Sequence, residues 1–346
     1  MRIRDYGIVP GRMAPGPLNK ITDVPGVQVG HSTIITETHN TGVTVVLPCP
    51  ENPFVHKLPC AAFVLNGFGK TTGLIQIDEL GTLETPIALT NTLNVGLVHD
   101  ALVEYMLRRC AAEGVPLRSV NPVVCECNDA SLNLISERAV KTEHVMEAIR
   151  SAGQNFAEGA VGCGRGTTCH GLKGGVGSAS RLVPLNGRNY TLGVLVQTNH
   201  GRMEDLTVDG KPIGREIAQE LSEGAPDKGS CIIILATDIP LSDRQLKRVL
   251  RRCSVGLARL GSFIGSGSGE VFIGFSTANP VTPGMPDITG CTVLNEERID
   301  LCFRAAAECT EEAVLNSMAA AEQVTVSGQT RYPLSAFLEK QNRRSF

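Results

Sequence analysis

The stretch GSCIIILATDIPL, residues 229–241, decides how the rest of the chain must fold. From Cys231 to Ala236 every side chain is apolar, so a strand built from these residues has no polar face to turn toward water. A strand of that kind is buried on both sides and needs another layer of structure against each face. The stretch therefore predicts a sheet that is covered on both faces.

Five other segments of the chain have the character of strands. Each is short, rich in apolar or β-branched residues, and bounded by Gly, Pro, Asn or Asp. They are GVTVVL (42–47), AAFVLN (61–66), PVVCEC (122–127), TLGVLVQT (191–198) and VFIGFS (271–276), beside the central strand at 231–237.

Amphipathic helices are predicted between these strands. Ser242 and Gln245 form a capping box, apolar residues follow at helical spacing, and Gly261 closes the helix as a left-handed cap. Further helices are expected from Val95 to about Gly114, over 142–152 and over 304–322. Strands interleaved with amphipathic helices predict a layered α/β (α+β) fold. We expect one domain over 1–346, with the polar stretch 222–229 as the best candidate for a break.

Composition excludes several classes of function. The 346 residues are 42% hydrophobic, 19% charged and 4% aromatic, with a formal net charge of -3, so neither a nucleic-acid nor a membrane partner is expected. No secretory signal is recognised, and twelve scattered cysteines favour reduced thiols in the cytoplasm. Cys163, Cys169 and His170 lack the paired spacing of zinc ligands, so no metal or cofactor is expected.

Three glycine-rich stretches approach known motifs but fail their spacing. Residues 67–71 (GFGKT) lack the earlier glycine of a P-loop, so we interpret them as a turn with a solvated lysine. Residues 162–181 never satisfy the dinucleotide pattern, and tight turns near an active-site wall are the better interpretation. The GSGSG run at 265–269 precedes a predicted strand, whereas a nucleophile elbow follows one.

Ser230 opens the central strand directly after Gly229. From these residues alone, an ordinary loop-to-strand junction is the simpler interpretation. The alternative has a mechanism, because a serine hydroxyl needs a base beside it to act as a nucleophile. A chain break before Ser230 would create an α-amino group with a pKa of about 7.7–8.0, which can be that base. Glycine at position 229 suits such a break because it tolerates strained backbone.

Segments along nearly the whole chain resemble the L-aminopeptidase/D-esterase (DmpA-like) family, which includes β-peptidyl aminopeptidases. The resembling segments are 15–34, 42–48, 65–74, 85–96, 123–133, 158–181, 193–201, 229–241 and 259–279. The resemblance implies an αββα four-layer sandwich, two sheets covered by helices, which ornithine acetyltransferases share. It also implies a self-processing serine aminopeptidase that removes N-terminal residues from short peptides, amino-acid amides or esters. Such proteins are commonly tetramers of cleaved heterodimers, so a homo-oligomer is expected.

The same resemblance places the processing site. It implies that the precursor cleaves itself between Gly229 and Ser230, giving fragments 1–229 and 230–346. Ser230 would then be the N-terminal nucleophile of the smaller fragment.

Four further residues receive roles from the resemblance. Ser268 and Glu270 would orient and tune the new amine and hydroxyl, Asn199 would stabilise the oxyanion, and Glu126 would meet the free amine of the substrate. The first three could equally be a turn serine, a solvated charge and a turn former. Glu126 has a physical rationale of its own, because an unpaired charge in an apolar strand is costly.

The chain departs from the family pattern at two places. Ala130 and Ser131 stand where glycine and often a bulky residue are expected, which predicts an altered pocket. Cys231 follows the nucleophile and is either a core thiol or a second nucleophile. Two other functions remain open at this point. An ornithine acetyltransferase-like acyltransferase would use threonine as its nucleophile, and an uncleaved relative would be non-catalytic.

Overall fold

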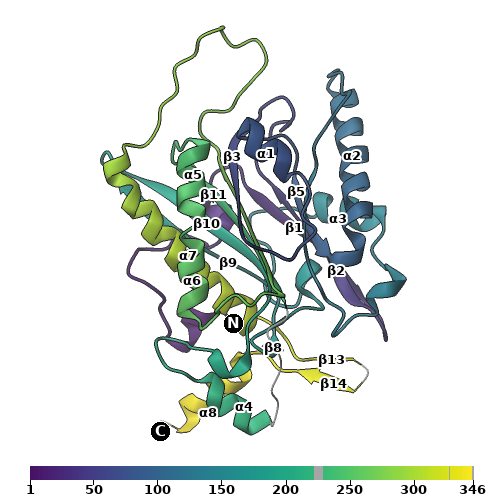
Figure 1. Ribbon diagram of the computed structural model, residues 1–346, viewed down its shortest axis with the longest axis vertical. Coiled ribbons are helices and arrows are strands. Elements are labelled where there is room, and N and C mark those ends of the chain that lie inside the picture. The colour runs from purple at the N-terminus through teal and green to yellow at the C-terminus, as the bar shows by residue number, and fades with distance from the viewer. Residues whose placement is uncertain (222–228, 327, 345–346) are drawn as a thin grey trace.

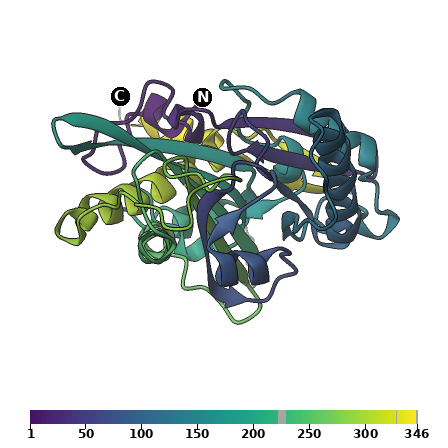
Figure 2. The ribbon, with the colours of Figure 1, turned by 90° about the horizontal axis from the view of Figure 1, so that it is seen from above.

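The structure is a computed structural model that describes residues 1–221, 229–326 and 328–344. Two sheets lie between two layers of helices, which is the αββα sandwich that the resemblance implies (Figures 1 and 2). Of the polar stretch 222–229, only Gly229 lies within the described residues.

The larger sheet is built around the apolar strand that follows Gly229. Its strand order is β4 (Thr82–Leu83), β3 (Leu58–Gly67), β12 (Gly269–Ser276), β11 (Ser230–Thr237), β10 (Arg188–Asn199) and β9 (Val176–Leu185). β11 runs parallel to β12 and antiparallel to β10. It is therefore an inner strand, with hydrogen-bonded neighbours on both edges.

The smaller sheet has the order β1 (Gln28–Ile35), β2 (Asn40–Leu47), β5 (Ile87–Asn91) and β6 (Val123–Cys127). Two short pairs accompany the sheets, β7 (Thr168–Cys169) with β8 (Leu172–Lys173) and β13 (Val324–Val326) with β14 (Gln329–Arg331). All six predicted strands are present. Within the two sheets, β1, β4, β5 and β9 were not predicted: β1 and β9 mix polar and apolar residues, β4 has two residues, and β5 ends in Thr90 and Asn91.

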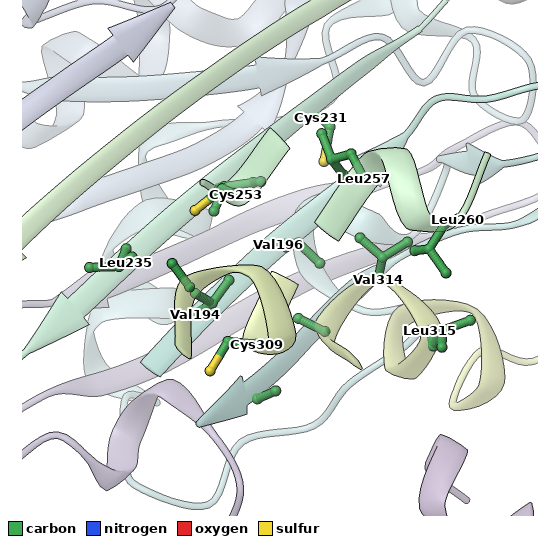
Figure 3. Close-up of a cluster of buried hydrophobic side chains, with 14 of the residues drawn as sticks. Val194, Val196, Cys231, Leu235, Cys253, Leu257, Leu260, Cys309, Val314 and Leu315 are labelled. Atoms are coloured by element: carbon green, nitrogen blue, oxygen red, sulfur yellow. The ribbon is translucent and has the colours of Figure 1, made fainter. Parts of the chain in front are cut away.

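Alternation along β11 explains why both of its faces are apolar. Ile232 and Ile234 belong to the core between the two sheets, whereas Ile233 and Leu235 belong to the core between the larger sheet and its helices. Figure 3 shows part of that second core, in which the strand residue Cys231 lies beside the helix residue Leu257. The prediction of a sheet covered on both faces is confirmed.

The helices form the outer layers, on opposite sides of the sheets in Figure 1. The larger sheet is covered by α5 (Asp243–Leu250), α6 (Cys253–Arg259) and α7 (Ile299–Ala319), and the smaller by α2 (Val95–Ala112) and α3 (Thr142–Arg150). The remaining helices are α1 (Leu74–Leu80), α4 (Gly214–Leu221) and α8 (Ser335–Arg344). Within the described parts of the chain, no helix is long and apolar enough to cross a membrane.

The helix predicted from Ser242 to Gly261 is divided in two. The capping box is present, with Ser242 Oγ and the Gln245 side chain each 3.2 Å from the other residue's backbone nitrogen, and Gly261 is left-handed at φ 91°. At Arg252, however, the backbone N–H bonds to the carbonyl of Val249, three residues back, at 2.9 Å. This tighter turn separates α5 from α6, and apolar spacing alone does not reveal it.

Candidate active site

The first residue of β11 lies between the ends of two neighbouring strands. Ser230 pairs with Asn199, the last residue of β10, on one side and with Gly269, the first residue of β12, on the other. Its carbonyl oxygen accepts a bond from Cys127 Sγ at 3.5 Å, which ties it to the smaller sheet. Ser230 is only 5% exposed.

Gly229 sits where no side chain fits. A Cβ at this position would lie 1.8 Å from the carbonyl oxygen of Asn199, and backbone cannot yield at that distance. Its φ lies outside the left-handed region, so close approach, and not the strain that the sequence suggested, requires the glycine. The Gly229 carbonyl accepts a bond from the N–H of Gly269 at 2.9 Å, which fixes the orientation of this peptide group.

The amide of Asn199 is oriented by a backbone donor. The N–H of Thr168 donates to Asn199 Oδ1 at 3.0 Å, and Asn199 itself is 6% exposed. With Oδ1 occupied in this way, the Nδ2 group is the end of the amide that can donate to a third party. Cross-strand pairing with Ser230 places that donor beside the serine.

Ser268 and Glu270 lie next to Ser230, around the start of β12. Ser268 Oγ donates a short hydrogen bond to Glu270 Oε1, and both residues are buried. Asn66 on β3 holds the loop that carries Ser268, because its Nδ2 donates to the carbonyl oxygens of Ser268 and, at 3.1 Å, of Gly265. The structure thus brings these two predicted residues together as a hydrogen-bonded pair.

Glu126 lies on β6, at the edge where the smaller sheet meets the same site. It is only 3% exposed. Oε1 accepts from the backbone N–H of Lys70 at 3.2 Å, and Oε2 accepts a short bond from Thr92 Oγ1. A carboxylate held by two donors at the wall of a cavity can receive a cation without first losing its own hydration.

One cavity joins the predicted residues. It has a volume of about 430 Å³, and its lining includes Ser230, Gly229, Asn199 and Glu126. Ser268 and Glu270 do not line the cavity. Gly267, the residue before Ser268, does line it. The sequence analysis missed several lining residues, namely Phe68, Lys70, Thr92, Asn128 and Thr168.

The loop interpreted as a turn with a solvated lysine is therefore part of the site. Lys70 is exposed, as expected, but its backbone N–H is one of the two donors to Glu126. The incomplete P-loop pattern marks residues 67–71 in the sequence. No local pattern shows that this loop contacts β6, more than fifty residues further along the chain. The glycine-rich segment 162–181 does supply an active-site wall, through Thr168.

The loop after β6 shapes the pocket where the chain departs from the family pattern. Ser131 lines the cavity. Asp129 anchors this loop, since its carboxylate accepts from Thr41 Oγ1 at 2.6 Å and from Asn133 Nδ2 at 2.9 Å. Burial raises the pKa of Asp129 to about 6. A small polar side chain at 131 leaves room that a bulky residue would fill.

Cys231 is a core thiol. It points away from the cavity into the core beneath α5, α6 and α7, and Figure 3 shows it there. Burial raises the pKa of its thiol well above the ordinary value, so a reactive thiolate is disfavoured. The alternative of a second nucleophile at this position is wrong on both counts.

Comparison with known proteins connects this geometry to a family. The model of Peptidase family S58 matches residues 19–331, which is most of the chain. The chain belongs to peptidase family S58. Together with its relatives, the family shows that the protein is a hydrolase, a serine aminopeptidase, which separates it from the acyltransferase alternative.

The relatives of this S58 peptidase agree over almost their full lengths. It is 39% identical over 350 residues to the beta-peptidyl aminopeptidase BapA of Sphingosinicella xenopeptidilytica, covering 94% of this chain and 86% of the relative. A crystal structure of a Pyrococcus horikoshii protein matches with a TM-score of 0.93 and 44% identity, covering 100% and 99% of the two chains. The L-aminopeptidase D-Ala-esterase/amidase of Ochrobactrum anthropi, a variant of the Ntn hydrolase fold, matches with a TM-score of 0.92 and 35% identity over 99% and 98%.

A buried lysine organises the wall of the S58 site. Lys173 on β8 is fully buried, and its Nζ donates to the carbonyl oxygens of Gly164, Thr167 and Gly174 at 2.7–2.9 Å. Burial lowers the pKa of Lys173, while the three acceptors match the three N–H donors of its ammonium form. One of those acceptors precedes Thr168, so the lysine braces the donor that orients Asn199.

Lys173→Met should therefore lower both stability and kcat. The apolar side chain fills a similar volume but removes three buried hydrogen bonds. The carbonyls of Gly164 and Thr167 keep other donors, so we expect a cost on the order of 1–3 kcal/mol. We expect a lower Tm, and a fall in kcat with KM nearly unchanged because Glu126 is untouched. Lys211→Met, at an exposed lysine, is the matched control and should leave both values as they are. An unchanged kcat in folded Lys173→Met would remove Lys173 from the positioning of Asn199.

Proposed function

We propose that this aminopeptidase cleaves its own chain between Gly229 and Ser230 and then uses Ser230 as an N-terminal nucleophile. The observation that carries the proposal is that Ser230, Asn199 and Glu126 line one cavity. A nucleophile, a candidate oxyanion donor and a candidate ammonium acceptor are the three groups that an aminopeptidase of this kind needs. The proposed fragments are 1–229 and 230–346, derived from one domain.

The geometry around Gly229 supports self-cleavage. Attack by Ser230 Oγ on the preceding carbonyl carbon builds negative charge on the Gly229 oxygen, to which the N–H of Gly269 already donates at 2.9 Å. Because β11 and β12 fix both partners of that bond, the donor needs no rearrangement. Asn199 lies against the same peptide group, where only glycine leaves space for it. Collapse breaks the C–N bond between Gly229 and Ser230, which frees the α-amine and leaves an ester on Oγ. Water hydrolyses that ester and releases fragment 1–229.

After cleavage, the chemistry of the cleaved enzyme follows from the same residues. The free α-amine of Ser230 takes the proton of its own hydroxyl, and Oγ attacks the carbonyl carbon of the substrate. The oxyanion is stabilised by Nδ2 of Asn199. Collapse of the intermediate expels the leaving amine or alcohol, which receives the proton, and leaves an ester on Oγ. Water then hydrolyses that ester and regenerates the free serine.

The remaining roles are positioning ones. Ser268 and Glu270, joined by their hydrogen bond, orient the new amine from the neighbouring strand β12. Glu126 pairs with the ammonium of the substrate. This ion pair positions the substrate by its N-terminus. An enzyme that reads the N-terminus in this way removes one terminal residue and does not cut within a chain.

The substrates we propose are short peptides, amino-acid amides and amino-acid esters. A cavity of about 430 Å³ is within the usual range for small-molecule sites and accommodates a compact ligand. Relatives are named as beta-peptidyl aminopeptidases and as an L-aminopeptidase D-Ala-esterase/amidase, so β-, L- and D-configured amides all belong in a substrate panel.

Glu126→Gln should raise KM for substrates that have a free amine. Glutamine preserves the size of the side chain but removes the charge, and losing one partner of a desolvated charge pair costs on the order of 2–5 kcal/mol. Because a polar contact remains, we expect the lower end of that range, roughly a thirtyfold increase. Steady-state kinetics on amino-acid p-nitroanilides measure it.

N-acetylated versions of the same substrates are the control for Glu126→Gln. They should be poor substrates of the wild-type enzyme and no poorer with the variant, because they carry no ammonium. The four measurements form a double cycle that separates the amine–carboxylate interaction from general damage. Equal losses of kcat/KM on free and blocked substrates would assign Glu126 a structural role. Efficient cleavage of blocked peptides by the wild type would show that the enzyme does not bind its substrates by the terminal amine.

We also propose a cytoplasmic location and a homo-oligomer, a tetramer of cleaved heterodimers. The location is supported by the cysteines, since eleven of the twelve are buried. The assembly is supported by the resemblance to the family. Size-exclusion chromatography with light scattering measures the mass of the assembly.

A further inference from the structure

A cluster of three side chains of types that bind metals lies next to Thr168 and Asn199, which line the cavity. Cys169 ends β7, His170 follows it, and His200 follows the last residue of β10. All three are buried, and one ligand atom from each lies within 4.8 Å of the others. We propose that Cys169, His170 and His200 bind one zinc ion.

The donor set fits zinc. A thiolate and two imidazoles are ligands that Zn²⁺ prefers, at Zn–S of about 2.3 Å and Zn–N of about 2.0–2.1 Å. In a tetrahedral site these bond lengths place two ligand atoms about 3.3–3.6 Å apart. The ligand atoms of the cluster lie within 4.8 Å of one another, so binding needs side-chain adjustments of at most about an ångström.

His200 supplies an independent reason to expect a ligand. It is 3% exposed, and neither of its ring nitrogens has a hydrogen-bond partner among the residues that the structure describes. Buried polar atoms are almost always satisfied, so an imidazole in this position calls for a partner. Its ring packs edge-on against that of His170, with centroids 5.5 Å apart, so the two imidazoles share one site.

His170 is held in the orientation of a metal ligand. Its Nδ1 lies 2.9 Å from the carbonyl oxygen of Arg202, and a donor bond to a backbone carbonyl is the usual way in which a ligating histidine is fixed. Nε2 is then the ligand atom. Gly201 allows this approach, because a Cβ there would lie 2.5 Å from atoms of the imidazole ring.

The position of the cluster suggests what the ion would do. Thr168 and Asn199 line the cavity and are joined by their 3.0 Å bond, whereas their neighbours Cys169 and His200 are buried beside them. A bound ion would cross-link β7 to the end of β10 directly behind that bond. Such a cross-link would hold the amide of Asn199 in place. This role of the ion rests on the proposed function of Asn199, whereas the metal site itself does not.

Sequence spacing could not reveal this site. Cys163, Cys169 and His170 lack the paired spacing of zinc ligands, and Cys163 belongs to the core between the two sheets. The third proposed ligand, His200, directly follows β10 and lies thirty residues after His170 in the sequence, so only the fold brings it near.

The experiment measures metal directly. In a Cys291→Ser background, which removes the exposed thiol, protein stripped with a chelator is dialysed against Zn²⁺ and then against metal-free buffer. We expect one retained zinc per chain, and with Co²⁺ the thiolate charge-transfer and visible bands of a tetrahedral site. His200→Phe keeps the ring packing but removes the ligand, and Cys169→Ala removes the thiolate; each should lose the metal. Cys253→Ala, at a buried thiol outside the cluster, should retain it.

Two results would overturn the proposal. One is the absence of stoichiometric zinc in the Cys291→Ser protein, and the other is retention of zinc by whichever of His200→Phe and Cys169→Ala is folded by circular dichroism. Ser230→Ala should bind zinc like the wild type, so a failure of the metal site and a failure of the proposed nucleophile are read out separately.

Discussion

Ser230→Ala should remain one intact chain of 346 residues, whereas the wild-type protein should appear as fragments 1–229 and 230–346. The variant lacks the only group that we propose to attack the Gly229 carbonyl, and it also lacks the nucleophile of the peptidase reaction. Both cleavage and hydrolysis should therefore be lost completely. Intact-mass spectrometry measures the first and p-nitroanilide hydrolysis the second.

Two variants test whether the effect belongs to Ser230 itself. Ser266→Ala, at an exposed serine in the loop before β12, should cleave normally. Ser230→Cys keeps a nucleophile on the same strand and should retain some cleavage. A wild-type protein that hydrolyses amides while staying intact would rule out the α-amine as the base, because that amine exists only after cleavage.

Asn199→Ala should lower kcat by about 10²–10³, the usual effect of removing one oxyanion donor. The bond from Thr168 to Oδ1 holds the amide with Nδ2 available as the donor. Self-cleavage should slow as well, since it passes through the same kind of intermediate. Single-turnover kinetics and the rate of fragment formation measure the two effects.

Asn199→Asp provides the matched control. It keeps the size of the side chain and the acceptor for Thr168, but it offers no N–H donor. It should lose at least as much kcat as the alanine variant, because its carboxylate also repels the oxyanion, while Glu126 remains intact to bind the substrate amine. An aspartate variant with wild-type kcat would show that Asn199 serves only to hold Thr168.

A layered fold with a sheet covered on both faces could be predicted from local patterns, whereas the four-layer αββα arrangement was implied by the family resemblance. The unbroken apolar run from Cys231 to Ala236 indicates burial on both faces, and neighbouring side chains do enter different cores. β9 escaped prediction because its buried residues include Ser178, Ser180 and Arg181. Arg181 is tolerated there because it pairs with Glu308 and Glu312 on α7, and a sequence pattern does not report such partners.

The site was only partly predictable, for the same reason. The family resemblance pointed to Ser230, Asn199 and Glu126, and the structure places these three around one cavity, although their roles stay predictions. The donors that hold Glu126, from Lys70 and Thr92, come from loops that look ordinary in sequence. Contacts across two sheets arise from topology, and a single sequence has no local signal for them.

The inner position of β11 has a consequence for the protein after processing. β11 and β12 would belong to the small fragment, while the strands on their outer edges, β10 and β3, would belong to the large one. The cut would therefore create a new chain end inside a continuous hydrogen-bonded sheet. Neither fragment could dissociate without breaking the hydrogen bonds between β10 and β11 and between β12 and β3. Processing would break one peptide bond but leave both fragments in one folded unit. We expect the two polypeptides to copurify, to unfold in a single transition and to need each other to fold.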